Sequence, residues 1–172
     1  MLLVAGIVDI VAGVTIENRL NTFATFPALL VMIPPFLEDS GSLGGILSAR
    51  LGSKLNLGTL DPRALRWNDL ADDILLTYLF AAVVFVMVGV SSSIVAALFG
   101  LAGPGVVRMI QIALLAGLAA TTAAVAVAVA TSLVTYRMGL DPDNHGIPMV
   151  TSSLDLFGSG ALIGALVLLG IH

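Results

Sequence analysis

Three stretches of this chain are apolar over more residues than a helix needs to cross a membrane. They occupy about residues 73–99, 106–136 and 147–171, and about 20 apolar residues span the hydrocarbon of a bilayer. Two further apolar stretches, at about residues 2–16 and 23–51, are shorter or interrupted by polar residues. The pattern predicts an all-α integral membrane bundle of five transmembrane helices. We interpret residues 2–16 as the first helix rather than as a signal peptide, since no basic segment or small-residue cleavage site accompanies it.

The composition agrees with a membrane location and excludes several functions. Of the 172 residues, 58% are hydrophobic and only 10% are charged, whereas a soluble domain carries about 25% charged residues. The length fits a single domain, residues 1–172. A net charge of −4 argues against nucleic-acid binding, which requires a basic face. The lack of cysteine excludes disulfides, thiolate catalysis and cysteine-based zinc sites.

The distribution of basic residues predicts the orientation of the bundle. Five of them flank or occupy the connections that follow the second and fourth apolar stretches: Arg50, Lys54, Arg63, Arg66 and Arg137. In a five-helix layout both connections lie on the same side, and basic connections favour the cytoplasmic side. We therefore expect a cytoplasmic N-terminus, with only Arg19 and Arg108 opposing this assignment.

The second apolar stretch contains residues that disfavour a regular helix in contact with lipid. Two prolines, two acids (Glu38 and Asp39) and three glycines fall within residues 34–45. Irregular backbone at membrane depth is tolerated only where protein buries it or where it lines a cavity, and interrupted helices commonly build ion sites. We expect an interrupted second helix with Asp39 as a candidate ligand. A loop at the membrane surface between two shorter helices explains the same acids equally well.

Asp155 is the charged residue that fits its surroundings least, because it lies within the last apolar stretch. A carboxylate at the centre of a membrane helix costs roughly 2.5–3.5 kcal/mol. Thr151 and Ser159 lie four residues to either side and are expected on the same helical face. Such oxygen ligands suit a hydrated Mg²⁺ ion, and two copies of Asp155 in a symmetric dimer would form a plausible site. The alternative is an acid that stabilises the N-terminal end of its helix.

Other polar residues are open to more than one interpretation. Asp9, in the middle of the first stretch, either lines an ion pathway or pairs with another helix. Asp72 and Asp73 are expected at a solvated helix start, and the acids of residues 141–144 are expected to form a turn.

The chain is not predicted to be an enzyme. Its two histidines, His145 and His172, fall in a loop and at the terminus, so no base is expected beside a nucleophilic serine. Phosphate-binding loops of the P-loop type are absent from the sequence.

Two segments resemble a known transporter family. Residues 139–158 read Gly-Leu-Asp-Pro-Asp-Asn-His-Gly-Ile-Pro-Met-Val-Thr-Ser-Ser-Leu-Asp-Leu-Phe-Gly. This segment resembles the last-helix signature of MgtE-type magnesium transporters, in which Asp-Pro is followed by Pro-x-x-Thr and Asp-x-x-Gly. Its Asp-Pro-Asp-Asn form is similar to that of the eukaryotic relatives, solute carrier family 41. Residues 41–50 are similar to the Gly-Asn-Leu…Ser-Arg stretch of the second helix, with Ser42 in place of the usual Asn.

The resemblance implies a pore at a homodimer axis, where Asp155 of each subunit holds a hydrated Mg²⁺ and Thr151 lies beside it. It also implies that the soluble N-terminal and CBS domains of bacterial members are absent from this chain. We therefore expect a divalent-cation channel or transporter of the cell membrane, with Asp39, Ser42 and Asp9 as further pathway residues. Two alternatives stay open: a membrane assembly subunit that transports nothing, and a divalent-cation exchanger coupled to Na⁺ or H⁺.

Overall fold

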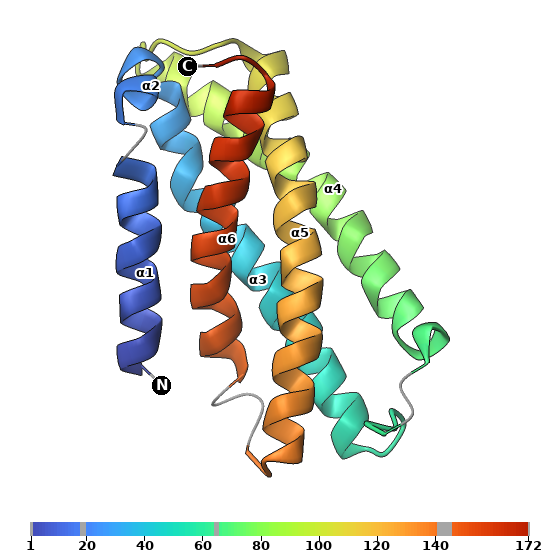
Figure 1. Cartoon of the computed structure of the whole chain (residues 1–172). Helices are drawn as coiled ribbons and strands as arrows, with labels where there is room; N and C mark the ends of the chain where they lie inside the picture. The colour runs from blue at the N-terminus through green and yellow to red at the C-terminus, as the bar shows by residue number, and fades with distance from the viewer. Residues whose placement is uncertain (1, 18–19, 64–65, 141–145, 172) are drawn as a thin grey trace.

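The computed structural model describes residues 2–17, 20–63, 66–140 and 146–171, and in these ranges it contains helices and no strand (Figure 1). The helices are α1 (Leu2–Glu17), α2 (Leu20–Thr25), α3 (Ala28–Asn56), α4 (Trp67–Leu98), α5 (Val106–Arg137) and α6 (Ile147–Leu168). α5 packs against α3, α4 and α6, and α3 also packs against α4 and α6. α1 packs mainly against α6, at the edge of the bundle. The all-helical prediction is confirmed.

Three helices of the described chain are long and apolar enough to cross a membrane: α4, α5 and α6. They correspond to the three long apolar stretches of the sequence. α1 has 16 residues, which is short for a span, and α3 carries acids and glycines along its middle. The membrane-spanning character of the chain is therefore clear, whereas the count of five spans stays a prediction.

The predicted interruption of the second helix is wrong, because α3 runs without a break from Ala28 to Asn56 with Pro34 and Pro35 inside it. Proline removes a backbone donor and weakens a helix locally, but in membrane bundles the neighbouring helices compensate for this loss. Here the glycines of α3 are buried in helix contacts rather than forming a loop. A Cβ atom built on Gly44 would lie 2.5 Å from Leu154 Cδ1 of α6. Tertiary packing thus overrides the local preference.

Glycines also decide how closely α4 approaches α5. A Cβ atom built on Gly89 would lie 2.7 Å from the Cα atom of Ile110, so the two backbones can meet only without a side chain there. Nearby, the fully buried rings of Phe36 and Phe85 have centroids 5.1 Å apart, and the Phe85 ring fills the space beside Gly117. The glycines of residues 41–45 likewise lie in contacts with α6, whereas Gly160 and Gly164 have no described neighbour within 4 Å of a built Cβ atom.

Replacing Gly89 by alanine is expected to destabilise the bundle by about 1–3 kcal/mol, because overpacking forces rigid backbone apart. Gly13→Ala is the matched control, since Gly13 is an exposed helical glycine of α1 with open space around it. The control should be neutral or slightly stabilising, as alanine favours the helix. Thermal unfolding in detergent, followed by circular dichroism, measures the difference. Equal unfolding temperatures for Gly89→Ala and wild type would show that the α4–α5 contact is looser than described.

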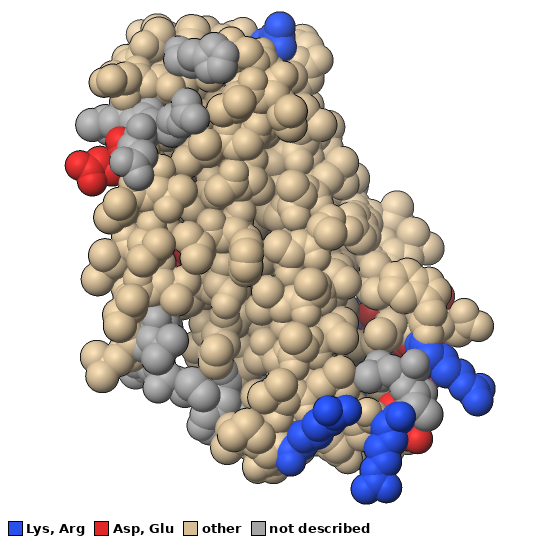
Figure 2. Space-filling model, viewed as in Figure 1, with Lys and Arg blue, Asp and Glu red and all other residues tan. Residues whose placement is uncertain are grey.

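The basic residues gather at one end of the bundle. Figure 1 shows that this end holds the start of α1, the α3–α4 connection and the C-terminal end of α5. Figure 2 shows most of the visible Lys and Arg side chains there, with one at the opposite end. The predicted grouping of these segments on one side is confirmed, and their cytoplasmic location stays a prediction.

Candidate functional site

Asp155 lies on α6 and faces α1. Its carboxyl group is half-buried, and the carboxyl group of Asp9 on α1 lies close enough to interact with it directly. The sequence pointed to these two acids separately, and the packing of α1 on α6 brings them together. Two ionised carboxylates that lie close together repel strongly where little water screens them. A cation between them would relieve this repulsion.

Thr151 lies one turn before Asp155, at the contact between α6 and α3. Its hydroxyl group donates a hydrogen bond to the Pro148 carbonyl at 3.1 Å, and its Cβ atom would lie 3.6 Å from a Cβ atom built on Gly41. The side chain is half-buried. Because a hydroxyl oxygen that donates can still accept, Thr151 can also orient a water molecule beside Asp155.

The polar face of α6 that was expected to carry Thr151, Asp155 and Ser159 does not extend to Ser159. Ser159 is fully buried, and its hydroxyl group donates to the Leu156 carbonyl of the same helix at 2.8 Å. The interpretation of a hydrated face at Ser159 is therefore wrong. Protein packing, rather than water, covers the Ser159 side chain.

Asp39 and Ser42 lie on α3 at the same level of the bundle as Asp155. Gly41 of α3 meets Thr151, and Ser40 and Leu37 meet Gly158, so Asp155 lies level with this segment of α3. Asp39 is half-buried beside Glu38, and Ser42 is exposed. Within the described part of the chain, acids and histidines form no group of three or more that could hold a metal.

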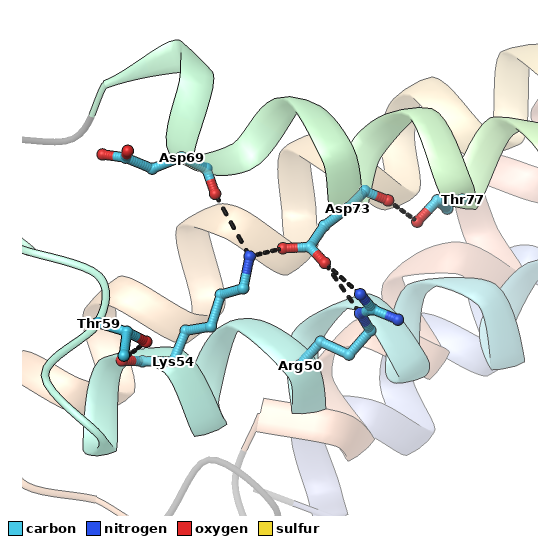
Figure 3. Close-up of polar contacts among 6 residues, drawn as sticks. All are labelled: Arg50, Lys54, Thr59, Asp69, Asp73 and Thr77. Carbon is cyan, nitrogen blue, oxygen red and sulfur yellow. Dashed lines mark hydrogen bonds and ion pairs between the residues drawn. The ribbon is translucent and has the colours of Figure 1, made fainter.

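Asp73 belongs to a polar cluster that we did not predict from the sequence. It was expected at a solvated helix start, but its exposure is only 2%. Arg50 donates to its Oδ1 atom from Nη2 at 2.6 Å and from Nε at 2.9 Å, and Lys54 pairs with its Oδ2 atom (Figure 3). The neighbouring Asp72 is exposed, as predicted. The cluster joins the end of α3 to the start of α4.

The sequence offered one usable signal for this cluster. Arg50 and Lys54 are four residues apart and therefore share a helix face, and Figure 3 shows both side chains reaching across to α4. Lys54 Nζ also lies 3.4 Å from the Asp69 carbonyl oxygen, and Thr77 donates to the Asp73 carbonyl at 2.7 Å. Asp141, Asp143, Asn144, His145 and His172 lie outside the described residues.

Comparison with known proteins identifies the family. The family model MgtE, described as a divalent cation transporter, matches residues 33–165, which is more than half of the chain. The chain belongs to the MgtE family. Solute carrier family 41 member 2 from Xenopus laevis and from Homo sapiens are each 25% identical to it over 162 residues, covering 90% of this chain. The chain spans 28% of the length of these curated relatives.

Family membership confirms the resemblance that the last-helix motif suggested. An MgtE-family chain with three apolar spanning helices is an integral membrane protein. The family is described as one of divalent cation transporters, which agrees with the function expected from the sequence.

Proposed function

We propose that this MgtE-family chain is a Mg²⁺ channel or transporter of the cell membrane, with five spans and a pore at the axis of a homodimer. The observation that carries the proposal is the proximity of the Asp155 and Asp9 carboxyl groups where the apolar helices α1 and α6 pack together. Ionisable residues at membrane depth are costly, and they typically mark ion pathways.

The chemistry of these ligands favours Mg²⁺. Asp155, Asp9 and Thr151 offer only oxygen atoms, which suit hard cations rather than zinc or copper. Mg²⁺ gives up its waters reluctantly and is usually held by one or two carboxylates together with several waters. A hydrated ion held between Asp155 and Asp9, with Thr151 orienting a water, fits that preference.

Two exposed surfaces support a homodimer. Glu38 and Ser42 point outward half-way along α3, where contact with lipid would leave a charge in hydrocarbon. Gly160 on α6 is also exposed, with no neighbour near it in the described chain, which suits close approach of another helix. A second copy packed on these surfaces would bring two Asp155 and two Asp9 carboxylates to one axis, with Asp39 and Ser42 nearby.

The test is Mg²⁺ uptake by purified protein in liposomes that contain a Mg²⁺-sensitive dye. We expect uptake that follows the Mg²⁺ gradient, together with crosslinking of the chain as a dimer. A dependence of uptake on an opposing Na⁺ or H⁺ gradient would identify an exchanger. A folded dimer that passes no Mg²⁺ under any gradient would overturn the proposal and favour an assembly subunit that transports nothing.

A further inference from the structure

A polar hollow lies at the basic end of the bundle, away from the proposed ion path. Its volume is about 520 Å³, and it lies between the α3–α4 connection and the last turn of α5. Its lining consists of Asp61, Pro62, Arg63, Tyr136 and Arg137. None of these residues contributes to the helix contacts around Asp155. The proposed ion path therefore does not account for the hollow.

The hollow lies at the level of lipid headgroups. α5 has 32 residues, which corresponds to roughly 48 Å at the helical rise per residue, whereas the hydrocarbon of a bilayer is only about 30 Å thick. At least one end of α5 therefore extends beyond the hydrocarbon, and the charge of Arg137 in the last turn favours a position there for that turn. Tyr136 is 36% exposed in that turn, and Trp67 is 70% exposed at the start of α4. Such aromatic side chains are enriched at membrane–water interfaces.

The lining of the hollow carries two guanidinium groups and one carboxylate. Arg137 donates from Nη2 to the Pro62 carbonyl at 3.2 Å, which holds the connection against α5 and occupies one of five guanidinium donors. The Asp61 carboxylate accepts a hydrogen bond from the backbone N–H of Arg63 at 2.8 Å, so it also organises the turn. The net charge of the lining is therefore positive. The side chain of Arg63 is exposed and free to reach a ligand in the hollow.

We propose that this hollow binds the phosphate of an anionic phospholipid. Guanidinium groups bind phosphate oxygens through paired hydrogen bonds, and basic pockets at the ends of membrane helices are suited to anionic headgroups. Apolar side chains continue from the hollow toward the bilayer along the outside of α5, where Val134 and Ala130 are both exposed. This apolar flank favours a lipid, whose acyl chains would cover it, over a free phosphate ion.

The experiment measures lipid retained by the purified full chain, using native mass spectrometry after exposure to phosphatidylglycerol or phosphatidylcholine. Wild type should retain phosphatidylglycerol in preference to phosphatidylcholine. The double variant Arg63→Gln/Arg137→Gln should bind it roughly 30-fold more weakly, since each basic residue near the surface contributes about one kcal/mol. Arg108→Gln is the matched control, because Arg108 is an exposed arginine at the other end of α5 and should leave retention unchanged.

Two further measurements keep the proposal open to refutation. The variant Arg63→Lys/Arg137→Lys keeps both charges, so it should fold and bind with intermediate strength. Inorganic phosphate in millimolar excess should not displace the lipid. Equal retention by wild type and the glutamine double variant, an equal loss in Arg108→Gln, or ready displacement by inorganic phosphate would each overturn the lipid assignment.

Discussion

Replacing Asp155 by asparagine is expected to reduce Mg²⁺ uptake on the order of 100-fold while leaving the dimer folded. Asparagine keeps the size of the side chain and removes its charge. Losing one charged partner from a poorly solvated charge pair typically costs 2–5 kcal/mol, which is enough to empty the site at ordinary Mg²⁺ concentrations. The measurement is the initial rate of dye response in liposomes, normalised to the amount of dimer recovered.

Asp9, the acid near Asp155, and Asp72, an acid away from the site, provide comparison variants for the uptake measurement. Asp9→Asn should reduce uptake less, because Asp9 is exposed on α1 whereas Asp155 is half-buried. If the two acids act on one ion, the double variant should be no worse than Asp155→Asn alone. Asp72→Asn, an exposed acid at the start of α4, should transport normally. Independent, additive losses in Asp9→Asn and Asp155→Asn would contradict a shared site.

The long helices could be predicted from the sequence because membrane spans are defined by length and hydropathy. α4, α5 and α6 follow the three long apolar stretches closely. The continuity of α3 could not be predicted in the same way. Pro34 and Pro35 signal a break by local rules, and only the burial of Gly41 and Gly44 against α6 explains why the helix continues.

The candidate site residues could be predicted individually, but their arrangement in space could not. Asp155 and Asp9 stood out because each is an acid in an apolar stretch, but whether they lie close together depends on how α1 is rotated about its own axis. A helix that is apolar nearly all round carries little periodicity from which to read that rotation. The same limit explains Asp72 and Asp73. They are neighbours in sequence, and the rotation of α4 decides that one is exposed and the other buried.

Removing both cations that pair with Asp73 is expected to destabilise the chain by about 3–5 kcal/mol, because an uncompensated charge is then left in a buried position. The variant is Arg50→Ala/Lys54→Ala, and the measurement is the free energy of unfolding in detergent with increasing denaturant. Arg50→Ala alone should cost less, since Lys54 still pairs with the carboxylate. Both basic side chains are partly exposed, so solvent screening places the single change near 1 kcal/mol.

The charge of Asp73 can be removed separately to identify the cause. Adding Asp73→Asn to the double variant should recover most of the lost stability, because the buried group is then neutral. Arg66→Ala removes an exposed arginine at the start of α4 that belongs to no ion pair among the described residues, and it should be neutral. If Asp73→Asn failed to rescue the double variant, the loss would arise from missing contacts of the Arg50 and Lys54 chains with α4. That result would show that the ion pairs of the Asp73 carboxylate do not stabilise the packing of α3 against α4.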